Sequence, residues 1–256
     1  KVDMYRQAGY VAAKFGAGWY NHASGEAFSS DSTQAWVDME AGKLEQLRDH
    51  VGKDFRICLD GHMGNRPDKL WDFEIAQAVM KVLEPFDLFL FEEALHYTNP
   101  WGYAELRKGT TIPIAGGECL TGEYEWQVYI EQDCFDIGQP DAAFTGGLTT
   151  FMRVAAMLER RDMRIATHSW AAGGGFMQNI HAGFAAANTI ILEIAPDYGP
   201  LHSEVIGDSF IFRDGRVHPP QKPGLGIELT DDTRRRFPFV PGSGEFNSVP
   251  GKILTD

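Results

Sequence analysis

Residues 112–141 read IPIAGGECLTGEYEWQVYIEQDCFDIGQPD, and this stretch decides the fold class. An apolar run at 112–117 is followed by a helix-like stretch at 122–132 and by a second apolar run at 135–141. Both runs are apolar for most of their length, which is typical of strands buried on both faces of a parallel sheet. The stretch therefore predicts one strand–helix–strand unit with short connections.

The same unit recurs from the first residues to about residue 195. Further strands are predicted at 10–15, 55–60, 88–93, 164–169 and 189–194, and further helices at 32–51, 70–83, 101–108, 147–160 and 174–187. This alternation implies either a barrel of the TIM type or a doubly wound sheet. A doubly wound sheet predicts a Gly-x-Gly-x-x-Gly turn after its first strand, but here the turn is FGAGWYN (15–21), without the third glycine. We therefore predict an α/β fold, a (β/α) barrel of the TIM type that has seven strands and is one strand short of closure.

Two further patterns predict local structure. In the helix at 147–160, apolar residues recur with the helical period and predict one buried face: Leu148, Phe151, Val154, Ala155 and Leu158. After about residue 200 the alternation ends, and FIFRDGRVHPP (210–220) predicts a hairpin with an Asp-Gly turn.

Composition excludes several classes of function. The chain has 256 residues with 23 Lys+Arg and 36 Asp+Glu, a net charge of −13, which argues against binding nucleic acid or an anionic membrane. No apolar stretch is long enough to predict a transmembrane helix. Three cysteines are too few for a disulfide framework, so we expect a reducing, cytoplasmic location.

Nearly every predicted strand is followed at its C-terminal end by a charged or ionisable residue. In a (β/α) barrel these ends meet on one face, and active sites are built there. The set consists of Lys14, Asp60, Glu92 with Glu93, Glu118, Asp141, His168 and Glu193.

Three of these carboxylates follow consecutive strands, namely Asp60, Glu92 and Glu118. An acidic residue after a strand can simply cap the next helix, and this alternative applies to Asp60 and Asp141 taken singly. It is weaker for glutamate, a poor cap. Burying three carboxylates together is costly unless a cation offsets their charge, and three oxygen ligands suit Mg²⁺. The sequence therefore predicts a magnesium site.

His168 follows a predicted strand, and Asp141 holds the equivalent place on the preceding strand. An aspartate beside a histidine fixes its tautomer and raises its basicity, which prepares a general base. Lys14 could be a satisfied ion pair, or it could supply positive charge to a developing oxyanion. His62 could contact a substrate or cap its loop.

Seven motifs in this order resemble the enolase superfamily, and within it the mandelate-racemase-type subgroup, which includes many acid-sugar dehydratases. They are VAAKFG (11–16), ICLDGH (57–62), FLFEEAL (89–95), IPIAGGE (112–118), IGQPDAAFTGGLT (137–149), IATHSW (165–170) and ILEIAP (191–196), followed by PGLGIEL (223–229).

The resemblance implies that Asp60, Glu92 and Glu118 bind Mg²⁺, with Glu92 rather than Glu93 because it matches the first residue of the family's acidic pair. It also implies that His168 and Asp141 form the general-base pair. Glu193 is similar to the carboxyl group that binds the substrate carboxylate opposite the metal. Such reactions begin by removing a proton α to a carboxylate, which gives an enediolate that Mg²⁺ stabilises.

The chain departs from the family pattern after Lys14. Racemases of this family carry Lys-x-Lys on this strand and use the second lysine as a base, whereas the triplet here is Lys14-Phe15-Gly16. The expected reaction is therefore dehydration of a sugar acid to a 2-keto-3-deoxy acid, in which His168 acts first as base and then as acid. A racemase or epimerase with another second base, or a non-catalytic member, are the alternatives.

The resemblance also implies a division of the chain. Residues 1–200 would form the barrel without its first strand. Residues 201–256 would be a strap that returns to an N-terminal α+β capping domain, most of which is absent from this chain. We expect a seam beside the strand at 10–15, a small-molecule sugar-acid substrate and a homo-oligomer. By position in loops, the candidates for substrate contact are Trp19, Tyr20, His22 and His96, together with His62.

Overall fold

A computed structural model describes residues 2–18, 28–65, 71–194 and 199–239 of the chain. Strands and helices alternate in this part as β1 Ala12–Gly16, α2 Thr33–Val51, β2 Arg56–Asp60, α3 Phe73–Leu83, β3 Leu90–Glu92, α4 Pro100–Lys108, β4 Ile114–Gly116, α5 Gly122–Glu131, β5 Ile137–Gly138, α6 Gly147–Glu159, β6 Arg164–Thr167, α7 Gly173–Ala185 and β7 Thr189–Leu192. The remaining elements are α1 Val2–Gln7, the 3-10 turns η1 Met63–Asn65, η2 Glu84–Phe86 and η3 Gly207–Ser209, α8 Pro200–Ile206, β8 Ile211–Arg213, β9 Arg216–His218 and α9 Asp231–Arg236.

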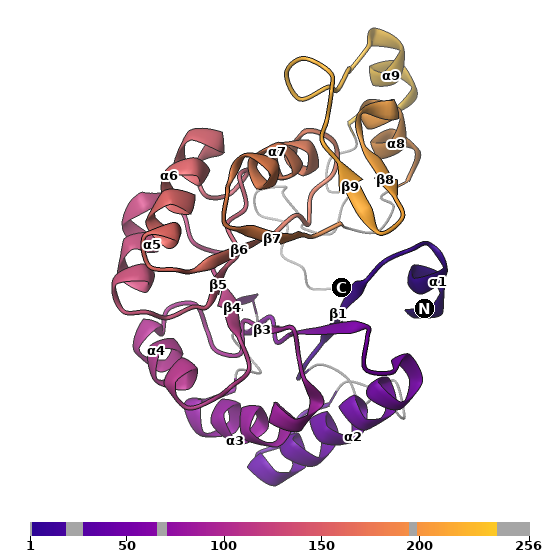
Figure 1. The fold of residues 1–256 in the computed structure, drawn as a ribbon. Helices are drawn as coiled ribbons and strands as arrows, with labels where there is room; N and C mark the ends of the chain where they lie inside the picture. The colour runs from indigo at the N-terminus through magenta and orange to yellow at the C-terminus, as the bar shows by residue number, and fades with distance from the viewer. Residues whose placement is uncertain (1, 19–27, 66–70, 195–198, 240–256) are drawn as a thin grey trace.

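The seven strands β1 to β7 form one parallel sheet in sequence order. Figure 1 shows this sheet curled, with helices α2 to α7 on its outer side. Within the described residues, β1 pairs only with β2 and β7 pairs only with β6, so the ring does not close. The predicted seven-stranded barrel with a seam beside β1 is confirmed. What fills the seam stays a prediction.

Alternation along each strand separates two apolar layers. On β2, Ile57 and Leu59 join the large core between sheet and helices, whereas Cys58 joins a small cluster on the inner face. Asp60 has the same parity as Cys58, so it belongs to the inner face. The sequence pattern thus sends the last residue of β2 toward the inside of the barrel.

Helix starts explain how the chain turns from strand to helix. The Asp72 side chain accepts a 2.8 Å hydrogen bond from the Ile75 N–H at the start of α3, and Asn99 caps α4 in the same way, 2.9 Å from the Gly102 N–H. The buried face of α6 holds Phe151, Val154, Ala155 and Leu158, as predicted, but Leu148 is exposed. Leu148 lies in the first turn of α6, where the helix has only just left the rim of the sheet.

The segment from α8 onward packs on the barrel itself. Ile206 of α8 is buried with Phe176, Met177 and Ile180 of α7, and residues of the following hairpin and loop pack around them. The hairpin is β8–β9 with the predicted Asp214-Gly215 turn. Its Phe212 ring lies 4.5 Å from the ring of Tyr10, next to β1. The division at residue 200 and the return to a capping domain stay predictions.

None of the helices in the described residues is long and apolar enough to cross a membrane. All three cysteines are free thiols. The location in the cell stays a prediction.

Candidate active site

Buried carboxylates gather at the C-terminal ends of β2, β3 and β4. Asp60 and Glu92 end their strands and are direct neighbours in the parallel register. Glu118 follows β4 by two residues. Their exposed fractions are 1%, 0% and 7%, and Glu93 is equally buried. The structure therefore brings the three predicted metal ligands to one edge of the sheet.

Lys14 of β1 reaches into this acidic cluster. Its Nζ lies 2.6 Å from Glu92 Oε2 and 2.9 Å from Asp60 Oδ2. The same ammonium group lies 2.9 Å from Glu193 Oε1, just after β7. Burial opposes the charged form, but the three carboxylates outweigh it and raise the pKa of Lys14 well above its usual value. Burial would also raise the pKa of Glu92, yet Lys14 holds it at about 2.

One ammonium group does not balance the cluster. Burial and the neighbouring Glu92 raise the pKa of Asp60 to about 7. The same two causes raise the pKa of Glu118 to about 7. Burial and the charge of Glu118 raise the pKa of Glu93 to about 9. The electrostatics of this edge therefore favour a further positive charge.

His168 and Asp141 form the predicted pair. His168 Nδ1 lies 2.8 Å from Asp141 Oδ2, and its Nε2 points toward the acidic cluster, 3.3 Å from Glu118 Oε2. Burial lowers the pKa of His168, but the bond to Asp141 and the charge of Glu118 raise it overall to about 9. Asp141 is fully buried. The geometry orients the imidazole with one nitrogen held and the other facing the site.

Glu193 links two sides of the edge. Its Oε2 accepts a 2.6 Å hydrogen bond from the Ser169 N–H, in the loop that follows β6, while its Oε1 meets Lys14. Among the predicted strand-end residues, Lys14, Asp60 and Glu92 lie inside strands. The others lie in the first residues of the following loops, because β3 to β7 end earlier than predicted.

Neither Asp60 nor Asp141 caps the following helix, since Asp72 is the N-cap of α3 and Gly146 is the N-cap of α6; each aspartate instead accepts a hydrogen bond within its own loop. Asp60 Oδ1 accepts from the His62 N–H at 2.9 Å, and Asp141 Oδ1 accepts from the Ala143 N–H at 2.7 Å. In each aspartate the other oxygen meets the site, at Lys14 or at His168. Each aspartate therefore stabilises its own loop with one oxygen and contacts a site residue with the other.

The candidates for substrate contact have different surroundings. His62 adopts a left-handed backbone (φ 46°), and its Nδ1 lies 3.2 Å from Asp60 Oδ1, beside the site. Burial lowers the pKa of His62. His96 stacks on Tyr97 and lies 2.7 Å from Thr98 Oγ1, within its own loop. Trp19, Tyr20 and His22 lie outside the described residues.

Sequence reasoning missed two polar residues. Asn179 of α7 is fully buried and donates to Asp141 Oδ1 at 2.9 Å. Its place on the apolar face of the helix predicted at 174–187, beside Phe176 and Ile180, is the signal that could have revealed it. Cys119 is the second. In the described part of the chain, one group of three His, Cys, Asp or Glu residues has ligand atoms that all lie within 4.8 Å of one another, and it consists of Glu93, Glu118 and Cys119.

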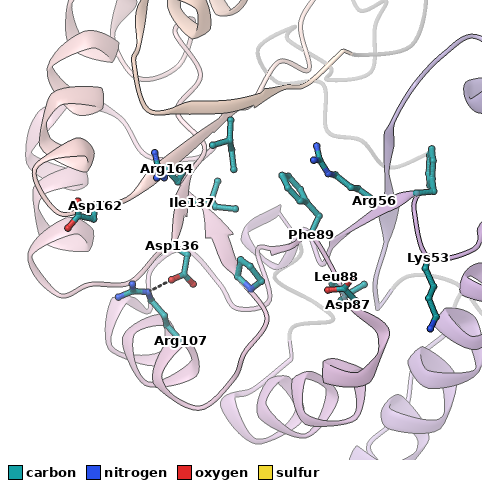
Figure 2. A pocket seen from close by; sticks show the side chains of 13 residues that line it. Lys53, Arg56, Asp87, Leu88, Phe89, Arg107, Asp136, Ile137, Asp162 and Arg164 are labelled. Carbon is teal, nitrogen blue, oxygen red and sulfur yellow. Dashed lines mark hydrogen bonds and ion pairs between the residues drawn. The ribbon is translucent and has the colours of Figure 1, made fainter. Parts of the chain in front are cut away.

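A separate cavity of about 500 Å³ opens at the opposite, N-terminal ends of the strands. Figure 2 shows Arg56, Phe89, Ile137 and Arg164 around it, with Arg107 paired to Asp136 at 2.8 Å. None of the residues of the acidic cluster lines this cavity. It is therefore distinct from the candidate active site.

Comparisons with known proteins agree with this architecture. The sequence model of the family described as "Enolase C-terminal domain-like" matches residues 1–233. A "D-galactonate dehydratase family member" of Streptomyces bingchenggensis is 27% identical over 94% of this chain and 62% of its own length. A "D-gluconate dehydratase" of Thermoproteus tenax is 28% identical over 91% of this chain and 44% of its own length. The chain thus spans less than two thirds of these relatives.

Among solved structures, a racemase from Streptomyces coelicolor, described with bound magnesium, is similar with a TM-score of 0.73 and 26% identity. The alignment covers 92% of this chain and 57% of that one.

Proposed function

Because this chain belongs to the enolase superfamily, as a member of its C-terminal domain-like family, we propose that it forms the barrel of a Mg²⁺-dependent sugar-acid dehydratase. The relatives named as galactonate and gluconate dehydratases support this substrate class. The observation that carries the proposal is that two networks of charged side chains meet at the C-terminal edge of the sheet. One joins Lys14 to Asp60 and Glu92, and the other joins Asp141 through His168 to Glu118.

The chemistry of the donor set suits a magnesium ion, but in this structure the carboxylate oxygens of Asp60, Glu92 and Glu118 do not all lie within 4.8 Å of one another, so these side chains would have to move closer to bind one ion. Asp60, Glu92 and Glu118 offer hard carboxylate oxygens from three adjacent strands, and the cluster carries more negative than positive side chains. The alternative group with Cys119 fits Mg²⁺ less well. The Cys119 sulfur is a soft ligand, whereas Mg²⁺ prefers hard oxygen ligands. Burial and the charge of Glu93 also raise the pKa of the Cys119 thiol, which disfavours the thiolate. We therefore assign Asp60, Glu92 and Glu118 as the residues that would hold the ion.

When bound, Mg²⁺ would supply positive charge beside the substrate carboxylate and so acidify the α-carbon proton. His168 Nε2 would remove that proton, while Asp141 stabilises the resulting imidazolium through Nδ1. His168 would then return the proton to the β-hydroxyl group, which leaves as water. The enol that remains rearranges to a 2-keto-3-deoxy acid.

Lys14 and Glu193 have supporting roles in this proposal. The Lys14 ammonium group would stabilise negative charge that develops on the substrate carboxylate. Glu193, which follows β7 and lies across the seam from β1, would bind the substrate carboxyl end by a hydrogen bond. His62 would contact the substrate from the loop after β2.

A racemase or epimerase is the second candidate, favoured by the similar racemase structure. Such a reaction needs a second base on the opposite face of the substrate. The position two residues after Lys14 is Gly16, which has no side chain to act as a base. This difference favours dehydration.

A screen of sugar acids with the complete protein and Mg²⁺ in D₂O tests the proposal. We expect a 2-keto acid product, and we expect His168→Asn and Glu118→Gln to abolish it. His50→Asn, on the exposed side of α2, is the control that should remain active. Recovered substrate that carries deuterium without any keto acid would instead establish epimerisation. Absence of both reactions, with no binding of Mg²⁺ by calorimetry, would favour a non-catalytic member.

A further inference from the structure

We propose that Asn179 is a positioning residue that holds Asp141, and through it His168, in the orientation required for proton transfer. This inference rests on the proposed function for its kinetic consequence, but the contacts that carry it are independent of any substrate. Asn179 is completely buried in α7, the helix that follows the loop carrying His168.

The amide of Asn179 is fully used. Its Oδ1 accepts a 2.7 Å hydrogen bond from the Ala142 N–H. Its Nδ2 donates to Asp141 Oδ1 at 2.9 Å and to the Gly175 carbonyl oxygen at 3.3 Å. The reverse orientation of the amide would place two donors together at Ala142 and two acceptors together at Asp141. The network therefore permits one orientation only.

These contacts divide the Asp141 carboxylate into two halves. Oδ1 accepts from Asn179 and from the Ala143 N–H at 2.7 Å, whereas Oδ2 is directed at His168 Nδ1 at 2.8 Å. Because both groups on Oδ1 come from fixed backbone or a buried helix, the carboxylate cannot rotate without breaking them. Oδ2 therefore stays in place, keeps the proton on His168 Nδ1 and leaves Nε2 to face the substrate.

Helix α7 also ties the two neighbouring loops together through this residue. Asn179 binds the loop after β5 at Asp141 and Ala142, while the chain between β6 and α7 carries His168. One side chain thus sets the relative position of the two loops that deliver the acid–base pair. A residue that only filled space at this point would be apolar, like its buried neighbours Phe176, Met177 and Ile180.

The test compares Asn179→Leu and the smaller Asn179→Ala with a matched control, Asn188→Leu. Asn188 is also buried and donates two hydrogen bonds, to the Ala155 and Met163 carbonyl oxygens, but it does not touch Asp141 or His168. We expect each Asn179 variant that folds to lower kcat about 10- to 100-fold with KM changed by less than about threefold, the size of effect typical of groups that orient a catalytic side chain. We expect Asn188→Leu to lose stability but keep kcat per folded molecule.

A spectroscopic readout requires no activity. In protein labelled with ¹⁵N-histidine, the His168 Nδ1–H proton bound to Asp141 should give a downfield resonance that exchanges slowly. We expect this resonance to shift or disappear in both Asn179 variants and to persist in Asn188→Leu. The inference would be overturned if the resonance were unchanged in the Asn179 variants. It would also be overturned if Asn188→Leu lost kcat and the resonance to the same extent as the Asn179 variants. Absence of dehydration in the wild type would contradict the proposed function, and the resonance would still decide the role of Asn179.

Discussion

Replacing Lys14 by methionine removes the ammonium group that lies 2.6 Å from Glu92 and 2.9 Å from both Asp60 and Glu193. At an effective dielectric constant of about 20, each such contact is worth about 6 kcal/mol before desolvation is subtracted. Removing one partner of a buried ion pair costs a net of about 3 to 5 kcal/mol, because the other charges stay buried. We expect Lys14→Met to lower the free energy of unfolding by that amount in metal-free buffer.

Magnesium should reverse much of this loss. The ion would offset the same carboxylates, and without the competing ammonium group it should bind more tightly to the variant than to the wild type. A ligand at 100 times its Kd adds about 2.7 kcal/mol of stability. Urea denaturation at pH 8, with EDTA and then with saturating Mg²⁺, should therefore show a difference between the two proteins that narrows when the ion is present.

Lys43→Met is the matched control. Lys43 is also buried, pairs with Glu40 and donates to the Gly16 carbonyl oxygen at 2.7 Å, but it contacts no carboxylate of the proposed site. We expect it to be destabilised equally with and without Mg²⁺. A Lys14→Met protein as stable as the wild type in EDTA, or a difference that Mg²⁺ leaves unchanged, would refute the reasoning.

Three further predictions address the ligands, the base and the packing. Calorimetry should show that Glu92→Gln weakens Mg²⁺ binding at least tenfold whereas Cys119→Ser leaves it unchanged; the opposite ranking would move the ion to the group of Glu93, Glu118 and Cys119. In metal-free protein the pKa of His168 is raised to about 9, so its stabilising contribution of about 3 kcal/mol should be complete below about pH 6.5 and disappear as the pH rises through 9. Urea midpoints from pH 6 to 10 should accordingly fall more steeply in the wild type than in His168→Asn, and parallel curves would contradict the raised pKa. Gly183→Ala should cost about 1 to 3 kcal/mol, because its Cβ would lie 2.2 Å from Leu192 Cδ2; an unchanged urea midpoint would show that β7 yields without strain.

The sequence predicted the strand–helix order because apolar runs and helical periods are local signals. It also predicted which residues meet, since parallel strands in sequence order bring their C-terminal ends together: Asp60, Glu92, Glu118, Asp141, His168, Glu193 and Lys14 all lie at one edge. Their roles in binding and catalysis remain predictions.

Other features depend on contacts that no local pattern records. Leu148 has the period of a buried position, but it lies in the first turn of α6 and is exposed among the described residues. Asn179 is buried because the Asp141 carboxylate and the Ala142 N–H come from a loop 37 residues earlier in the chain. The segment at 200–236 packs on α7 through residues whose partners are set by the path of the chain rather than by their own sequence.

The ion pair between Lys14 and Glu193 joins the first and last strands of the sheet, which share no backbone hydrogen bonds within the described residues. This ion pair spans the seam, so the separation of β1 and β7 sets the width of the site. A ligand that contacts residues on both sides should hold the two strands at a constant separation. Its binding should slow amide hydrogen exchange along β1 and β7 more than along β4, the strand midway between them.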